Sequence, residues 1–287
     1  MQRPTFILAV LDHGPADPGL VSKASQLAAR FDARLELFLC DAEHAYALKH
    51  EYEPSHNVEF RRECMDRALD YLAEVRHTVR LPHERVTLSA ACESPLYEGI
   101  ERKVRQSQPD LVVKSASGLE SGSWRMFDSN DWQLMRKCPA TLMLTRGQIW
   151  RMRPRIAAAV DVSSEETPGL AASILEAAEA LRGAYDGELD VVYSAPAPLE
   201  KRSRDARELS LRNLAQAFHV GNGHVHMLDG PPEMTLPAFV AQRDYDVLLM
   251  GALTHRPGAV ALVGTLTSRL VDTIPCDFIL IKAGPDA

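Results

Sequence analysis

The chain has 287 residues, which is comfortable for two α/β domains, and its 46% apolar and 25% charged residues are ordinary for a soluble globular protein. The net charge of -7 argues against a basic nucleic-acid surface, and no apolar run is long enough to cross a membrane. Five widely spaced cysteines without a CxxC pair suit a reducing compartment. We therefore expect a cytoplasmic protein with neither a nucleic-acid nor a membrane partner.

Short continuous apolar runs recur along the whole chain and predict strands covered on both faces. The ten predicted strands lie near 5–11, 34–40, 85–90, 111–115, 140–145, 155–161, 188–194, 224–229, 246–250 and 277–282. Helical stretches separate them, and alternating strands and helices indicate parallel sheets with right-handed crossovers.

The second half of the chain repeats the order of the first. Each half opens with Arg-Pro and an apolar strand that ends in an acid, Asp12 or Asp161, followed by Pro-Gly-Leu and an Ala-rich helix. Each half closes with a strand that a cysteine precedes, Cys138 or Cys276. Agreement at the start, the middle and the end, in the same order, argues against chance similarity.

The repeat predicts two domains, residues 1–148 and 149–287, each a five-stranded parallel sheet with helices on both faces. Because the linker "GQIWRMRP" (147–154) is short, we expect the two domains to pack on each other. Such packing would give the chain an internal pseudo-two-fold symmetry, and it leaves both a monomer and a homodimer open.

A glycine-rich loop follows the predicted strand near 246–250. Glycines at 251, 258 and 264 allow backbone N–H groups to approach oxygens closely, and Thr265 precedes a helical stretch whose N-terminus favours an anion. The alternative is an ordinary turn in which Thr265 only caps the helix. Neither GxxxxGK[ST] nor GxGxxG is present. Parallel sheets bind ligands at the carboxyl ends of their strands, which adds Asp161 and Ser194 to the candidates.

This loop resembles that of the universal stress protein family, whose nucleotide-binding members carry Gly, two residues, Gly, nine residues and then Gly-Ser or Gly-Thr. Gly251, Thr254, Gly264 and Thr265 fall at those intervals. The duplicated layout, "DWQLMRKCP" (131–139) and the "CDFILIK" ending resemble the tandem E-type members of the family. The resemblance covers essentially the whole chain.

The resemblance implies an α/β fold of the adenine nucleotide alpha hydrolase-like type, with ATP and Mg²⁺ held across the strand ends. It implies that Asp161 lies near the ribose and any metal, Ser194 near the base, and Gly251, Gly264 and Thr265 along the phosphates. The nucleotide-binding candidates are therefore Asp161, Ser194, Gly251, Thr254, Gly258, Gly264 and Thr265.

Two departures from the family pattern shape the expected function. Thr254 replaces the second glycine of the motif, and its β-branch crowds a close backbone approach. In the first half, Ser115 replaces the first glycine, Met126-Phe127 stand where Gly-Thr belongs, and Asp131 brings negative charge to the helix that follows. We expect weak or regulated ATP binding in the second domain and a degenerate loop in the first.

The segment after the second predicted strand holds the metal-binding residue types Cys40, Asp41, His44, His50 and His56. Their spacing fits no standard zinc finger, so we expect polar side chains on a loop and no metal site. We expect Cys92 to be a buried small side chain. No GxSxG elbow and no pair of acids with a partner base is present, so we predict no catalytic residue.

These features together predict a cytoplasmic stress-response protein that acts through partners and binds ATP in its second domain. Two alternatives stay open: a slow ATPase, and an interaction module that binds no nucleotide. The sequence names neither the stress, nor the partner, nor a ligand of the first domain.

Overall fold

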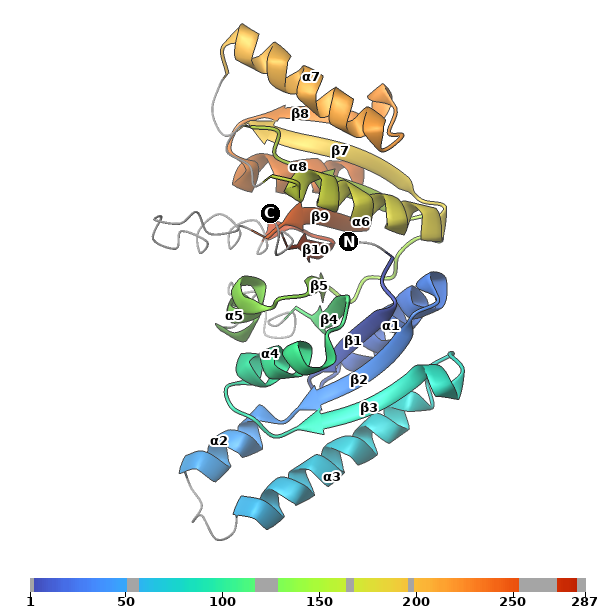
Figure 1. Cartoon of the computed structure of the whole chain (residues 1–287), viewed down its shortest axis with the longest axis vertical. Helices are drawn as coiled ribbons and strands as arrows, with labels where there is room; N and C mark the ends of the chain where they lie inside the picture. The colour runs from blue at the N-terminus through green and yellow to red at the C-terminus, as the bar shows by residue number, and fades with distance from the viewer. Residues whose placement is uncertain are drawn as a thin grey trace. The chain divides into compact units, whose positions relative to one another are not determined.

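The computed structural model describes residues 3–50, 57–116, 129–163, 168–195, 199–252 and 273–282. The chain falls into two compact units, Pro4–Ile149 and the chain from Trp150 on. Both units are α/β and each contains one parallel five-stranded arrangement, so the predicted fold class is confirmed (Figure 1).

In the first unit the strands lie in the order β3-β2-β1-β4-β5, and each neighbouring pair is parallel. The strands are β1 (Phe6–Leu11), β2 (Arg34–Cys40), β3 (Val86–Ala91), β4 (Leu111–Ser115) and β5 (Thr141–Thr145). The helices are α1 (Asp17–Phe31), α2 (Ala42–His50), α3 (Asn57–Arg76), α4 (Leu96–Ser107) and α5 (Ser129–Lys137). Helices α1 and α3 cover one face of this sheet while α4 and α5 lie on the other, as right-handed crossovers require (Figure 1).

The second unit repeats this arrangement in the order β8-β7-β6-β9-β10, again with parallel neighbours. Its strands are β6 (Arg155–Ala159), β7 (Glu188–Ala195), β8 (Val225–Asp229), β9 (Val247–Gly251) and β10 (Asp277–Ile281), and its described helices of four residues or more are α6 (Leu170–Tyr185), α7 (Lys201–Ala217) and α8 (Pro232–Arg243). All ten predicted strands are present, each within two residues of its expected bounds. None of the described helices combines the length and the apolar character that a membrane span requires.

The central strands form the core of each unit. Ile7, Leu8 and Val10 of β1 and Ile156 and Ala158 of β6 have no solvent exposure. Side chains that point to opposite faces of a strand are buried alike, because helices cover both faces of a parallel sheet. This double burial explains why these strands read as continuous apolar runs rather than as alternating patterns.

The two units share equivalent hydrogen bonds and helix ends. Asp110, just before β4, accepts the backbone N–H of Phe6 at 3.0 Å, and Asp246, just before β9, accepts that of Arg155 at 2.8 Å. Helices α1 and α6 both end at an aspartate in the left-handed region, Asp32 and Asp186, as helices commonly end at such a residue. The duplication therefore extends from the order of elements to individual hydrogen bonds.

Candidate functional site

The carboxyl edge of the sheet in the second unit carries the described site candidates. The last residue of β6 is in register with Val192 of β7 and Met250 of β9. Asp161 lies two residues after the end of β6, Ser194 lies two residues after Val192, and Gly251 lies one residue after Met250. The three positions therefore share one edge of the sheet, where open parallel sheets hold their ligands.

The Asp161 carboxylate organises the turn that follows β6. Its Oδ1 accepts the backbone N–H of Ser163 at 2.7 Å, which fixes the carboxylate in place. The acid is half-buried, and within the described part of the chain it forms no ion pair. Its second oxygen therefore remains available to a ligand hydroxyl or to a cation.

The Ser194 hydroxyl ties the end of β7 to the turn between β8 and α8. Its Oγ donates to the carbonyl of Gly230 at 2.8 Å and lies 2.6 Å from Oγ1 of Thr235. The residue is only 9% exposed. Because the single hydroxyl proton is used inside the protein, Ser194 can act toward a ligand only as an acceptor.

Gly251 has a packing role in the fold that does not depend on what the loop after it binds. A Cβ at this position would stand 2.7 Å from Cδ2 and 3.2 Å from Cγ of Leu170, on α6. Such a distance is shorter than a van der Waals contact, so glycine lets α6 approach β9 closely. The other loop candidates, Thr254, Gly258, Gly264 and Thr265, lie outside the described residues, and their phosphate role stays a prediction.

The residue patterns of the sequence assigned neither Tyr193 nor Arg207 to the site, although Tyr193 lies near Asp161. Tyr193 of β7 is buried, and Arg207 of α7 donates to its phenolic oxygen. Burial raises the pKa of the Tyr193 phenol, the charge of Arg207 opposes this rise, and the nearby Asp161 carboxylate adds to it. Arg207 belongs to a basic stretch that is typical of a solvated helix face, so only the fold shows that it turns toward the strand ends.

In the first unit, a buried lysine neutralises the acid that corresponds to Asp161. Asp12 follows β1 as Asp161 follows β6, and its Oδ2 lies 2.9 Å from Nζ of Lys114 on β4. The Lys114 side chain is 1% exposed, and its Nζ also lies 3.3 Å from Oδ1 of the fully buried Asp131 on α5. A built-in ammonium group therefore stands beside the acid that the repeat equates with Asp161.

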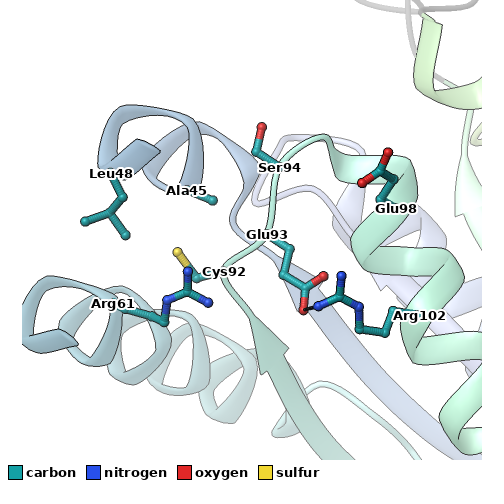
Figure 2. Close-up of a pocket in the computed structure, with 8 residues that line it drawn as sticks. All are labelled: Ala45, Leu48, Arg61, Cys92, Glu93, Ser94, Glu98 and Arg102. Carbon is teal, nitrogen blue, oxygen red and sulfur yellow. Dashed lines mark hydrogen bonds and ion pairs between the residues drawn. The ribbon is translucent and has the colours of Figure 1, made fainter. Parts of the chain in front are cut away.

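The first unit also contains a pocket of about 310 Å³ beyond the carboxyl ends of β2 and β3. Figure 2 shows its lining residues, Ala45, Leu48, Arg61, Cys92, Glu93, Ser94, Glu98 and Arg102. Arg102 is bound to Glu93 at 2.9 Å, which neutralises both charges. Burial raises the pKa of the Cys92 thiol to about 11, which makes it a weak nucleophile at neutral pH. Cys92 is 2% exposed, so the expectation of a buried cysteine is confirmed.

The Cys/His segment after β2 is only partly assembled as a cluster. Asp41 and His44 form a pair, with Oδ2 and Nδ1 2.7 Å apart, while Cys40 instead donates to the carbonyl of Glu93. His50 ends α2, and His56 lies outside the described residues. The thiol that completes the group is Cys64 of α3, which no sequence spacing indicated.

Comparison with known proteins gives a uniform result. The model of the "Universal stress protein family" matches residues 6–146 and 152–282. Universal stress protein E of Photorhabdus laumondii is 22% identical, over 96% of this chain and 94% of its own length. Universal stress protein E of Escherichia coli K12 is 21% identical, over 96% and 93%.

Two solved structures resemble the chain along nearly its whole length. A Pseudomonas aeruginosa protein described as functionally unknown aligns with a TM-score of 0.77 at 20% identity, over 97% of this chain and 92% of that one. A universal stress protein from Archaeoglobus fulgidus aligns with a TM-score of 0.67 at 13% identity, over 100% and 98%. At these identities the likeness establishes the fold and leaves the ligand to be argued from the residues.

Proposed function

Because the chain belongs to the universal stress protein family, as a tandem E-like member, we propose that its second unit binds ATP with Mg²⁺ weakly or under regulation. The protein then acts in the cytoplasm as a stress-response protein whose output passes through partners. Its first unit keeps the fold and does not bind nucleotide at the corresponding edge.

The observation that carries this proposal is the contrast between Asp161 and Asp12. Asp12 is already paired with the buried Lys114, at 2.9 Å. Asp161 has no such cation in the described part of the second unit and is held only by the N–H of Ser163. A carboxylate oxygen is a ligand that Mg²⁺ accepts, and it also accepts ribose hydroxyls. Among the described residues, the second unit therefore has an acid without a cation partner, whereas the corresponding acid of the first unit is paired.

The neighbours of Asp161 refine the expected binding mode. Arg207 donates to the phenol of Tyr193, the residue before Ser194, and would offer positive charge to the phosphates of a nucleotide held at this edge. Ser194 would accept a hydrogen bond from the amino group of the base, since its own proton is committed to Gly230 or Thr235. The family motif assigns the phosphates to the loop with Gly264 and Thr265, in which Thr254 limits a close backbone approach.

Calorimetry with ATP and Mg²⁺ on the intact chain and on Gly264→Asp tests the proposal. A carboxylate beside the phosphates repels them, so we expect affinity to fall by roughly tenfold or more, or about 1.4 kcal/mol. The matched control is Gly221→Asp in the same unit, because Gly221 is exposed and a Cβ there meets nothing within 4 Å. The control should bind ATP as the parent does.

The result also separates the alternatives. Binding that Gly264→Asp weakens, without phosphate release from the parent, supports the proposal. Phosphate release that disappears in Gly264→Asp identifies a slow ATPase instead. If neither the parent nor the control gives a binding heat at millimolar ATP, the chain is an interaction module and the proposal is wrong.

A further inference from the structure

We propose that the first unit holds a zinc site made by Asp41, His44 and Cys64. One ligand atom from each of these residues, a carboxylate oxygen, an imidazole nitrogen and the thiol sulfur, lies within 4.8 Å of the other two. Asp41 follows β2, His44 is in the first turn of α2, and Cys64 is on α3. The site is independent of the nucleotide edge of the second unit and of the function proposed for it.

The separations suit a tetrahedral ion after small side-chain movements. Zinc binds sulfur at about 2.3 Å and nitrogen or oxygen at about 2.0 to 2.2 Å, so its ligand atoms stand roughly 3.3 to 3.8 Å apart. The 2.7 Å contact between Oδ2 of Asp41 and Nδ1 of His44 must therefore lengthen as the ion enters. This change replaces one hydrogen bond by two metal bonds and moves the two groups by less than a bond length.

The combination of donor atoms selects the metal. A thiolate is a poor ligand for Mg²⁺ and Ca²⁺, which prefer oxygen, whereas Zn²⁺ accepts sulfur, nitrogen and oxygen together. Binding replaces the thiol proton of Cys64 with the ion, and that proton is released to solvent. Three protein ligands leave a fourth position, and the partial exposure of His44 (40%) and Asp41 (20%) opens it to solvent.

Surrounding contacts hold the three ligands in place. The other carboxylate oxygen of Asp41 accepts the backbone N–H of His44 at 3.0 Å, and the His44 ring packs against Phe60 with centroids 5.8 Å apart. Cys64 is fully buried, and Nη2 of Arg67 donates to its sulfur at 3.4 Å, which holds the thiol in place. Such supporting contacts orient metal ligands and tune their affinity.

A hydrophobic shell surrounds the thiol side of the cluster. Cys64 belongs to a buried group with Ala45, Leu48 and Cys92, against which Phe60 and Met65 pack. Ala45, Leu48 and Cys92 also line the 310 Å³ pocket, so the proposed ion lies next to a cavity (Figure 2). The low-dielectric shell on the thiol side strengthens the pull of a bound cation on its anionic ligands.

Absorption spectroscopy with Co²⁺ as the probe tests the site in the intact, untagged chain. Tetrahedral Co²⁺ bound to a thiolate gives intense visible bands and a sulfur-to-cobalt charge-transfer band in the near ultraviolet. We expect one equivalent to bind with this band, Zn²⁺ to displace it, and Cys64→Ala to abolish it. Asp41→Asn and His44→Gln should each weaken metal binding by roughly 10- to 100-fold.

Matched controls come from the same unit. His77→Gln replaces an exposed histidine one residue beyond α3, and Cys138→Ala replaces a buried cysteine next to α5. Both should bind Co²⁺ as the parent does. Thermal unfolding without metal shows whether each variant is folded. If Cys64→Ala does not fold, the metal affinities of Asp41→Asn and His44→Gln test the site instead. A parent without the charge-transfer band, or equal affinity in the parent and in both of these variants, overturns the proposal.

Discussion

Lys114 has unusual surroundings for a lysine, because its buried ammonium group lies between two carboxylates. Its ammonium group lies 2.9 Å from Asp12 and 3.3 Å from Asp131, and both Lys114 and Asp131 are essentially without solvent exposure. A buried ion pair adds little net stability relative to apolar residues, because desolvation opposes the attraction. Removing one partner alone is costly, since the remaining charge stays buried.

Replacing Lys114 with methionine should therefore destabilise the protein. Methionine is the residue at the equivalent position of the second unit, Met250. We expect the free energy of unfolding to fall by about 3–5 kcal/mol, measured by urea denaturation. Arg105→Met, which removes an exposed partner of Glu101, is the control and should cost less than about 1 kcal/mol. Equal losses of unfolding free energy in the two variants would show that the buried pair contributes no more to stability than an exposed one.

Helix α6 and strand β9 meet at Gly251, at the carboxyl edge of the sheet. Leu170, at the start of α6, and Ile174, one turn later, both face the position where a Cβ would stand. Leu170 is itself buried, so it has little room to move away. A side chain at position 251 would push the helix from the strand.

Gly251→Ala should lower the free energy of unfolding by about 1–3 kcal/mol, as overpacking of a core does. In a Leu170→Ala background the same substitution should cost less, which a double-mutant cycle measures. Gly183→Ala on the exposed side of α6, where a Cβ meets nothing within 4 Å, should instead stabilise by roughly 0.5–1 kcal/mol. Additive costs of Gly251→Ala and Leu170→Ala would argue against the clash.

The elements themselves could be predicted because burial on both faces leaves a plain signal. Runs such as "FILAVL" and "VLLMG" are easily recognised as strands, and the repeat indicated two equivalent sets of five strands. Contacts between elements could not be predicted in this way. The pairing of Lys114 with Asp131, the turn of Arg207 toward Tyr193, and the approach of Cys64 to His44 all join residues from different elements. The nucleotide role of Gly251 stays a prediction, and the sequence could not show that Leu170 of α6 packs against this position.

At the scale of the whole molecule, hydrogen bonds between distant elements make stability depend on pH. The Tyr71 phenol of α3 donates to Oδ2 of Asp17 at 2.7 Å, and the Asp17 carboxylate also accepts the backbone N–H of Asp12 at 3.1 Å and that of Gly14 at 3.3 Å. Burial raises the pKa of Tyr71, and the hydrogen bond and charge of Asp17 add to this rise. The predicted packing of the two domains on each other stays a prediction at this scale.

The sign of the pH effect follows from the raised pKa of Tyr71. Up to about pH 10, the ordinary tyrosine value, both the folded and the unfolded chain keep the proton and the full stability is present. Above that pH the unfolded chain releases the proton first, so the free energy of unfolding falls as pH rises. Urea denaturation between pH 8 and 11 should show this decline, and it should be shallower in Tyr71→Phe.

Tyr46→Phe serves as the comparison for this experiment, since the Tyr46 side chain is 56% exposed. We expect it to leave the slope of stability against pH unchanged. If Tyr71→Phe declines as steeply as the parent, the alkaline instability arises elsewhere, for example at Tyr245, whose pKa burial also raises.

The ammonium group of Lys114 also bears on how the proposed function would respond to dose. With the acid after β1 already satisfied from within the chain, only one of the two repeated units would sense the nucleotide concentration. In a monomeric chain, saturation would then follow a simple hyperbola, since cooperative binding needs at least two coupled sites. The duplicated chain would report the nucleotide pool as a graded readout rather than as a threshold, despite having two copies of the fold.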